Sequence, residues 1–202
     1  MSQTDTGRRR DPDRRARILG AAAELAAQRG FHSVGMAEIG AQAGIVGSGI
    51  YRHFDSKSAV LVAVLDQGMD RLAHRASEIV SQAPDDRSAL SALVRDHIEV
   101  AITERDMLAT YHREVHNLPD DDRRRLRRRQ RHYLEDWVHV LAPLRPELSD
   151  PELRLTVQAA IGAVQSTLFF RSGLADDRLR ILLDATAHRC LGVEPTSELQ
   201  IT

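Results

Sequence analysis

The placement of the seven prolines constrains the fold most, because they separate long segments whose apolar residues recur with a helical period. Proline lacks a backbone N–H and breaks a helix interior, so these positions predict helix boundaries. In the first segment Ile18, Ala22, Leu25 and Ala26 share one face of a helix. Aromatic residues make up only 4% of the chain, and runs of strand-forming residues are absent. We therefore predict an all-α fold. The prolines are Pro12, Pro84, Pro119, Pro143, Pro146, Pro151 and Pro195.

Composition excludes several classes of protein. Of the 202 residues 42% are hydrophobic and 28% charged, which is too apolar for a disordered chain. No stretch approaches the roughly 18 apolar residues of a membrane span, and no apolar targeting segment is visible, so we expect a cytoplasmic protein without membrane contact. The single cysteine, Cys190, excludes an intramolecular disulfide and a thiolate zinc cluster, and we expect it in a helix core. The net charge is −1, so any basic surface must be local.

The apolar periods and the punctuating residues predict about nine helices. Six of the twelve glycines lie between residues 30 and 49, so we expect short helices and tight turns there. Ser56 is a good N-cap for the fourth helix, and Gly173 and Gly192 are expected to close the last two. The expected helices cover about 13–29, 36–43, 47–53, 56–82, 87–102, 106–117, 119–142, 151–171 and 176–191.

The short helices of the first part have the spacing of a helix-turn-helix. Gly40 is small where the second helix crosses the first, and Gly44 can adopt the left-handed conformation of a turn. Ile39, Ile45 and Ile50 would point inward and set the crossing angle. The exposed face of the next helix is then free to enter a major groove. The same spacing also fits an ordinary helical hairpin.

Side chains that donate hydrogen bonds follow this segment directly. Tyr51, Arg52 and His53 bring a hydroxyl, a guanidinium and an imidazole to the end of the expected recognition helix, and Phe54 is an apolar anchor. Lys57 begins the next helix, where backbone N–H groups also face an anion. Phosphate contacts need such donors at both flanks of an inserted helix, which favours DNA binding over the plain hairpin.

Five short motifs of this region carry a family resemblance. They are Gly30-Phe31, Met36-Ala37-Glu38-Ile39-Gly40, Ala43-Gly44-Ile45, Ile50-Tyr51-Arg52-His53-Phe54 and Ser56-Lys57. Over about residues 14–65 the chain resembles the N-terminal domain of the TetR family of one-component repressors. The resemblance implies a homodimer with a three-helix DNA-binding head and a larger C-terminal domain for ligand sensing and dimerisation. In that scheme a small molecule respaces the two heads and releases the operator.

The resemblance and the helix pattern together divide the chain into four expected parts. They are a flexible basic arm over 1–12, a helix-turn-helix DNA-binding domain over 13–55, a ligand-binding and dimerisation domain over 56–194, and a tail over 195–202. Arginines crowd the start of the chain, either as a solvated leader or as an arm that reaches phosphates or a minor groove. They are Arg8, Arg9, Arg10, Arg14, Arg15 and Arg17.

The head departs from the family pattern at two positions. Gly35 stands where the family usually has a phosphate-binding Thr or Ser, and Ala37 stands where a base-reading Arg often occurs. The recognition helix exposes small residues, so base readout would depend on Ser48, Arg52 and apolar contact from Val46 with thymine methyls. The predicted DNA-binding residues are Val46, Gly47, Ser48, Gly49, Tyr51, Arg52, His53 and Lys57.

Bulky residues on facing helix stripes predict an apolar pocket enclosed by the fourth to eighth helices. Gln130 sits centrally in one stripe and Glu114 lies at the edge of another. Such polar groups need partners, which leaves three explanations: a core ion pair, polar groups that orient a ligand, or a dimer contact. The lining favours a lipid-like or acyl-thioester effector. The predicted pocket residues are Met69, Leu72, Ile98, Met107, Tyr111, Gln130, Tyr133, Trp137, Val164, Leu168 and Phe169.

Two further patterns in the second part have competing interpretations. The arginine-rich run over 123–131 is either a solvated face balanced by the acids at 120–122 or a site for an anionic ligand, such as the phosphates of a coenzyme A thioester. His112 and His116 have a spacing that can chelate a metal, but no HExxH order or acidic triplet accompanies them, which favours surface histidines. No nucleophile, P-loop or dinucleotide-binding motif is present, so we expect no enzyme, no metal and no cofactor.

The eighth expected helix is apolar on two opposite faces, which predicts that it is buried on both. One face would close the core of the subunit. The other carries small residues and would pack with the ninth helix against a second copy in a four-helix bundle. The predicted dimer-interface residues are Ala159, Gly162, Ala163, Ser166, Phe170, Ile181 and Ala185.

The leading interpretation is a ligand-responsive, dimeric repressor that binds a palindromic operator on double-stranded DNA and is released by a small, apolar or acyl-type effector. One alternative is a DNA-binding regulator controlled by a protein partner. Another is a metal-dependent sensor or enzyme that uses His112 and His116. Operator binding relieved by an apolar small molecule would select the first, and zinc-dependent activity the third.

Overall fold

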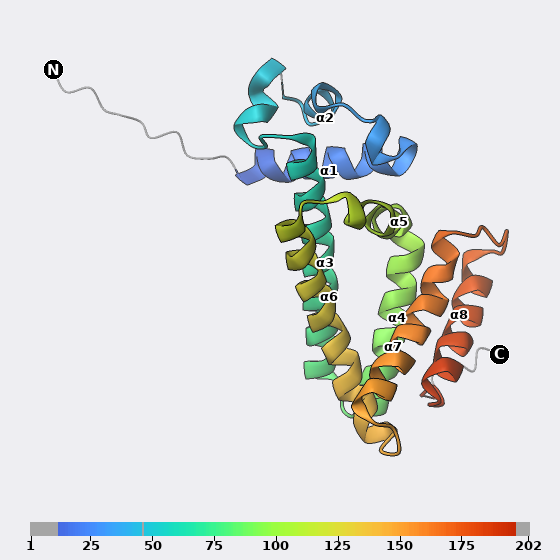
Figure 1. Ribbon diagram of the computed structural model, residues 1–202. Coiled ribbons are helices and arrows are strands. Elements are labelled where there is room, and N and C mark those ends of the chain that lie inside the picture. The colour runs from blue at the N-terminus through green and yellow to red at the C-terminus, as the bar shows by residue number, and fades with distance from the viewer. Residues whose placement is uncertain (1–11, 46, 197–202) are drawn as a thin grey trace. The chain divides into compact units, whose positions relative to one another are not determined.

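The computed structural model describes residues 12–45 and 47–196, and within them all regular structure is helical (Figure 1). These residues form eight α-helices and five short 3-10 helices. The prediction of an all-α fold is therefore confirmed. Arg8, Arg9, Arg10 and Val46 lie outside the described residues. No helix in the described part of the chain is long and apolar enough to cross a membrane.

The described residues divide into two compact units, one ending at Val64 and the other beginning at Leu65. The first contains α1 (Pro12–Arg29), α2 (Met36–Gln42), the 3-10 helix η2 (Gly47–Arg52) and the start of α3 (Lys57–Gln82). Its core is a single apolar cluster, and the most completely buried members are Ile18, Ala22, Ile39, Ile50 and Val60. The inward-facing residues that the helix-turn-helix spacing requires are thus Ile39 and Ile50, with Ile45 half-buried against them.

Local sequence explains where the helices of the first unit begin and end. Gly30 and Gly44 have φ of 78° and 69°, a region that residues with a Cβ avoid, and they end α1 and the turn after α2. Ser56 caps α3, because its Oγ accepts a hydrogen bond of 3.1 Å from the backbone N–H of Ala59. Glu38 caps the start of α2 by accepting from the Gly35 N–H at 3.3 Å. The predicted caps at Gly44 and Ser56 therefore form.

The third expected helix is a 3-10 helix over Gly47–Arg52 rather than an α-helix. Two of its six residues, Gly47 and Gly49, are glycines, which have a high entropic cost in an α-helix. A short 3-10 segment is the usual form for such a piece. The element therefore lies at the predicted residues, but it has the tighter winding of a 3-10 helix.

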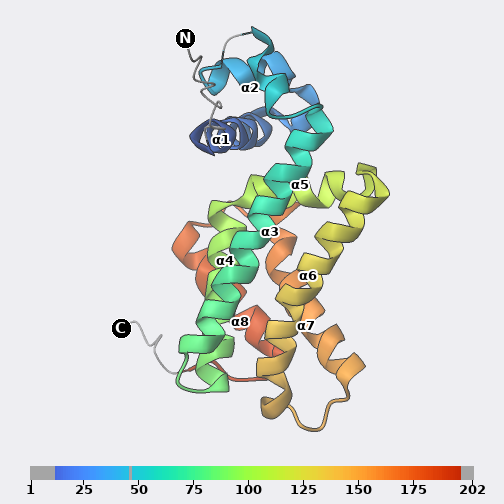
Figure 2. The same ribbon diagram turned by 90° about the vertical axis from the view of Figure 1, so that its left-hand side faces the viewer.

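The second unit is a bundle of antiparallel and crossing helices (Figure 2). It contains the rest of α3, followed by α4 (Asp86–Thr103), α5 (Arg105–Glu114), α6 (Asp120–Leu141), α7 (Asp150–Gln165) and α8 (Asp176–Leu191). Helix α4 packs against α5, α6, α7 and α8, and α7 lies along α8. The largest fully buried side chains of this unit include Trp137, Leu90, Leu126, Leu141 and Leu191.

Two expectations about the last helices are wrong. Helix α7 ends at Gln165 and a 3-10 turn over Ser166–Leu168 follows, so the helix does not reach residue 171. The hydroxyls of Ser166 and Thr167 bond back to the carbonyls of Ala163 and Val164, which competes with helix continuation. Cys190 is exposed rather than in the core, because α8 buries Leu183, Ala187 and Leu191 instead.

Candidate DNA-binding surface and ligand cavity

The exposed side of η2 presents side chains that can donate to DNA. Ser48 and Arg52 are exposed, Tyr51 is 55% exposed, and His53 is half-buried. Phe54 is buried in the core of the first unit and holds the end of this element. The arrangement leaves a hydroxyl, a phenol and a guanidinium free to meet phosphates or base edges.

Lys57 has a structural contact in addition to its predicted role at DNA. Its Nζ donates a hydrogen bond of 2.7 Å to the carbonyl oxygen of His32 and lies 5.1 Å from the ring centroid of Phe31. An ammonium group has three donors, so two remain after this bond. The contact joins two of the motifs, Gly30-Phe31 and Ser56-Lys57, since the aromatic ring and the carbonyl hold the ammonium in place.

Two of the arginines expected in an N-terminal arm, Arg15 and Arg17, lie in α1 and contact the rest of the first unit. The guanidinium of Arg15 lies 5.1 Å from the Phe54 ring centroid, beside the end of η2. The Nε of Arg17 donates to the Ala43 carbonyl at 3.3 Å. These contacts place two positive charges against the helix-turn-helix, whereas only a spatial fold could show which of the many N-terminal arginines do so.

Packing within the first unit explains why small residues occur at the turn. A Cβ on Gly49 would lie 2.7 Å from Cγ2 of Ile45, and one on Gly40 would lie 3.4 Å from the Ile45 carbonyl oxygen and 3.7 Å from Cβ of Ile50. The first is too close for a real contact, and the second is ordinary van der Waals distance. Gly49 is therefore needed for packing, whether or not it also contacts DNA.

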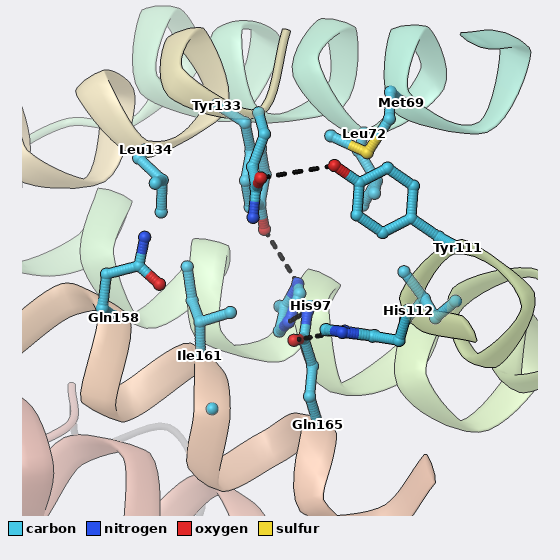
Figure 3. Close-up of a pocket in the computed structure, with 13 residues that line it drawn as sticks. Met69, Leu72, His97, Tyr111, His112, Tyr133, Leu134, Gln158, Ile161 and Gln165 are labelled. Atoms are coloured by element: carbon cyan, nitrogen blue, oxygen red, sulfur yellow. Dashed lines mark hydrogen bonds between the residues drawn. The ribbon is translucent and has the colours of Figure 1, made fainter. Parts of the chain in front are cut away.

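The second unit encloses a cavity of about 110 Å³ between α3, α4, α5, α6 and α7 (Figure 3). These are the five helices between which the pocket was expected. The wall combines aliphatic side chains with tyrosine, histidine and glutamine. The lining residues are Met69, Leu72, His97, Leu108, Tyr111, His112, Gln130, Tyr133, Leu134, Gln158, Ile161, Gly162 and Gln165.

The predicted pocket residues are divided by the structure. Met69, Leu72, Tyr111, Gln130 and Tyr133 line the cavity. The others do not: Ile98, Trp137, Val164 and Leu168 are buried in the core, Met107 packs against Gly68, and Phe169 is 67% exposed. An apolar stripe on one helix shows which side faces inward, but not which of its residues borders a space.

A relay of hydrogen bonds crosses the inner wall of the cavity (Figure 3). Gln165 Nε2 donates to Nε2 of His97 at 3.3 Å, so His97 carries its proton on Nδ1 and donates to the Tyr133 hydroxyl oxygen at 2.9 Å. His112 Nε2 donates to the Gln165 carbonyl oxygen at 3.0 Å. On the far side the Tyr111 hydroxyl donates to Gln130 Oε1 at 3.3 Å.

His97 and Tyr133, the central pair of the relay, are uncharged near neutral pH. Burial lowers the pKa of His97 to about 4, with a further contribution from His112, so the imidazole is neutral. Burial raises the pKa of Tyr133, which keeps the phenol protonated. Burial also raises the pKa of Tyr111, against a smaller opposing effect of Arg127. His97, Tyr133 and Tyr111 therefore offer hydrogen bonds to the cavity without a formal charge.

The sequence missed most of this relay. His97 is 1% exposed and lies in a largely apolar face of α4, a buried polar group of the kind that needs a partner. That signal was available, although its partners on α6 and α7 were not. His112 was expected on the surface, but it is half-buried, bonds to Gln165 and lies 5.6 Å from the Phe169 ring centroid. His116 is exposed. In residues 12–45 and 47–196 no cluster of three or more His, Cys, Asp or Glu could hold a metal.

The arginine run of α6 is only partly balanced by acids. Arg123 and Arg124 pair with Asp120 and Asp121 one turn away. Arg125 and Arg129 reach across to α3, which runs alongside α6 in both views (Figures 1 and 2). Their partners on α3 are Asp66, 2.9 Å from Arg125 Nη2, and Asp70. Arg127, Arg128 and Arg131 have no ion pair among the described residues.

The two faces of α7 differ in burial. The face expected to close the core is buried at Leu153, Val157, Ala160, Ile161 and Val164. On the other face Ala159, Gly162, Ser166 and Phe170 are exposed and Ala163 is half-buried, whereas on α8 Ile181 is exposed and Ala185 half-buried. Large apolar residues of α7, of α8 and of the segment between them are exposed as well: Leu155, Phe169, Phe170, Leu174, Ile181 and Leu182.

Comparison with known proteins places both units in one family. Residues 18–64 match the family model described as bacterial regulatory proteins, tetR family, and residues 81–168 match the one described as tetracyclin repressor-like, C-terminal domain. The HTH-type transcriptional repressor KstR2 of Rhodococcus jostii is 33% identical over 129 residues, which span 63% of this chain and 63% of that relative.

Solved structures share the fold. A TetR-family transcriptional regulator from Bordetella parapertussis superposes with a TM-score of 0.74 at 22% identity, covering 93% of this chain and 97% of the other. The regulator FadR from Bacillus subtilis, solved in complex with stearoyl-CoA, gives a TM-score of 0.71 at 19% identity, covering 89% and 99%. Together with the two family matches, these likenesses lead to one conclusion: the chain belongs to the TetR family of transcriptional regulators.

Proposed function

We propose that this protein is a dimeric transcriptional repressor that leaves its operator when a small acyl-type effector enters the cavity of the second unit. The observation that carries the proposal is the presence of two separate sites in one chain. The first unit exposes Ser48, Tyr51 and Arg52 on η2, and the second encloses a cavity of about 110 Å³. A binding surface for DNA and a binding site for a small molecule are the two parts that ligand-controlled repression needs.

An acyl thioester fits the second unit for two reasons. The cavity wall is aliphatic and aromatic with a few hydrogen-bonding groups, which suits an acyl group. Arg127 and Arg131 lie on the same face of α6 as the lining residues Gln130 and Leu134, because residues one turn apart share a face. Both are exposed and without an ion pair among the described residues, so they are available to phosphates of a coenzyme A moiety. The stearoyl-CoA complex of the FadR relative supports this ligand class.

A second copy of the chain is the proposed partner for the exposed face of α7 and α8. Apolar residues such as Leu155, Phe170 and Ile181 are uncommon on the surface of a monomer when they gather in one region. The small residues Ala159 and Gly162 between them would allow another helix to approach closely. A twofold dimer through this face would give the two heads the symmetry of a palindromic operator.

The decisive experiment is selection of DNA sequences by the full-length protein, followed by release assays on the recovered site. We expect a palindromic site whose half-sites are one helical turn apart, about 34–36 Å. Release is then measured by fluorescence anisotropy with acyl-CoA thioesters of several chain lengths, with free coenzyme A as the control. Recovery of no palindrome would contradict the dimeric repressor, and a site that no thioester releases would contradict the effector class and favour control by a protein partner.

A further inference from the structure

The inner wall of the cavity has more hydrogen-bonding capacity than the protein itself uses. With His97 donating to its oxygen, the Tyr133 hydroxyl proton has no acceptor among the described residues. The amide nitrogen of Gln130 likewise has no acceptor among the described residues, because only the Oε1 atom of this side chain is bonded, to the Tyr111 hydroxyl. Tyr133 is 3% exposed, so its unused proton is costly unless a ligand accepts it. Both side chains line the cavity.

His97 and Tyr133, the bonded pair of this wall, carry no charge that would hold an ion. His97 is neutral and fully buried, and its pKa of about 4 keeps it so at physiological pH. Tyr133 stays protonated. A carboxylate at this end would lose its hydration without meeting a cation, whereas an uncharged oxygen would meet two donors.

The size of the cavity limits what fits beside this wall. Its volume of about 110 Å³ is small compared with the roughly 300–1,000 Å³ of pockets for drug-sized ligands. A cavity of about 150 Å³ is known to hold a benzene ring. A group of about that size therefore suits this cavity.

We propose that the inner end of this cavity selects a compact, uncharged group that carries a hydroxyl or carbonyl oxygen. The effector is then a short or ring-shaped acyl group bearing such an oxygen, rather than a plain long alkyl chain. The inference rests on the proposed role of the cavity as the effector site. Tyr133 and Gln165 are the residues that determine this preference, the first as a donor and the second by fixing the direction of the relay.

The matched fragments phenol and toluene test the preference without any coenzyme A. They are nearly equal in size, and a purely apolar cavity favours toluene because phenol must give up hydration. We expect calorimetric titration of the full-length protein to show phenol binding at least about tenfold more tightly than toluene. Benzoate at pH 7 is expected to bind more weakly than phenol.

Two variants locate the effect. Gln165→Met and Tyr133→Phe each remove hydrogen-bonding atoms at similar volume, and each is expected to lower the phenol-to-toluene ratio about tenfold while leaving toluene affinity within about threefold. Leu134→Met changes an apolar lining residue and should leave the ratio unchanged. Equal binding of both fragments to the unaltered protein, binding of neither, or an unchanged ratio in both relay variants would overturn the inference.

A second pair of ligands, two acyl-CoA thioesters, distinguishes this inference from the proposed function. Release of the selected operator is compared for 3-hydroxybutyryl-CoA and butyryl-CoA, and the hydroxylated thioester is expected to act at about tenfold lower concentration. If neither thioester releases the operator while phenol is still preferred to toluene, the proposed effector class fails and the selectivity of the cavity stands. If both release it equally, the proposed function stands and the inference fails.

Discussion

Lys57 shows how one residue of the head serves packing and, as we predict, DNA binding. Its ammonium bonds to the His32 carbonyl and lies over the Phe31 ring, and two of its three donors remain. The same side chain stands at the start of α3, close in sequence to η2. A residue with both roles is sensitive to substitution for two separable reasons, and the salt dependence of binding distinguishes them.

We predict that Lys57→Ala weakens binding to every DNA sequence tested. Losing one phosphate contact removes one counterion-release event, so the slope of log affinity against log salt should become shallower by about one unit. Arg124→Ala, which removes an equal charge at an exposed position of α6, is the control and should leave the slope unchanged. A Lys57→Ala protein with unaltered affinity and slope would show that the predicted docking of the head is wrong.

Gly44 allows the positive φ of the turn after α2, and comparison with a second glycine-to-alanine substitution isolates this effect. Its φ of 69° is unfavourable for a residue with a Cβ, so Gly44→Ala is expected to destabilise the protein by about 1–2 kcal/mol. Gly20 lies exposed within α1 and a Cβ there meets nothing within 4 Å, so Gly20→Ala should stabilise by about 0.5–1 kcal/mol. Urea denaturation monitored by circular dichroism gives both values, and the same sign for the two variants would contradict the assignment of the turn.

At the scale of helices, the relay joins three elements that are remote in sequence. His97 comes from α4, Tyr133 from α6 and Gln165 from α7, and the rings of His97 and Trp137 meet edge to face at 6.1 Å. These contacts connect the helices that surround the cavity. Since His97 is buried and neutral, we expect its protonation to disrupt these contacts between the helices.

The pKa of His97 predicts how stability depends on pH. The pKa falls from 6.5 in the unfolded chain to about 4 in the fold, so between these values the unfolded state binds the extra proton. Keeping His97 neutral in the fold therefore lowers no stability above pH 6.5. As the pH falls from 6.5 to about 4, the free energy of unfolding decreases by about 3 kcal/mol in total. Chemical denaturation of the unaltered protein and of His97→Gln at pH 7, 6 and 5 measures it. In His97→Gln the free energy of unfolding should no longer show this dependence on pH. In the control His74→Gln, at a side chain 76% exposed, the dependence should remain. An equal slope in His97→Gln would contradict the prediction.

The arginine run of α6 shows why a charge pattern needs the structure for its interpretation. Four of its arginines are paired, two of them with acids of α3, and three are not. Sequence alone could find the neighbouring acids at 120–122, but not Asp66 and Asp70. The unpaired arginines, and not the whole run, are therefore the candidates for an anionic ligand.

At the scale of the whole molecule, dimerisation is a prediction that a well-placed substitution can test. Gly162 is a poor choice for this test, because it borders the cavity as well as lying on the predicted interface. Ile181 is 51% exposed on α8 and is not part of the cavity lining. Ile181→Glu is expected to give a monomer in sedimentation and to lower operator affinity at least about tenfold, because one head then binds without the other.

The control for this prediction introduces the same carboxylate elsewhere. Ser77 is exposed on α3, and Ser77→Glu should remain a dimer and bind DNA normally. Circular dichroism should show that both variants are folded. If the Ile181→Glu protein still sediments as a dimer, the interface lies on another face.

The sequence by itself determined the helical elements and the head, because both depend on local rules. Helical period, Gly44 and Gly192 with positive φ, and the Ser56 cap act within a few residues, so most helix boundaries agree with prediction. The head's motifs lie within one short stretch of chain. Tertiary structure alone decided which residues line the cavity and that Cys190 is exposed. The cavity is the space left where side chains of five helices meet, and burial of Cys190 depends on which side of α8 faces α4 and α7. Such contacts join residues far apart in the chain, and the local pattern of α8 does not encode which side of that helix meets the core.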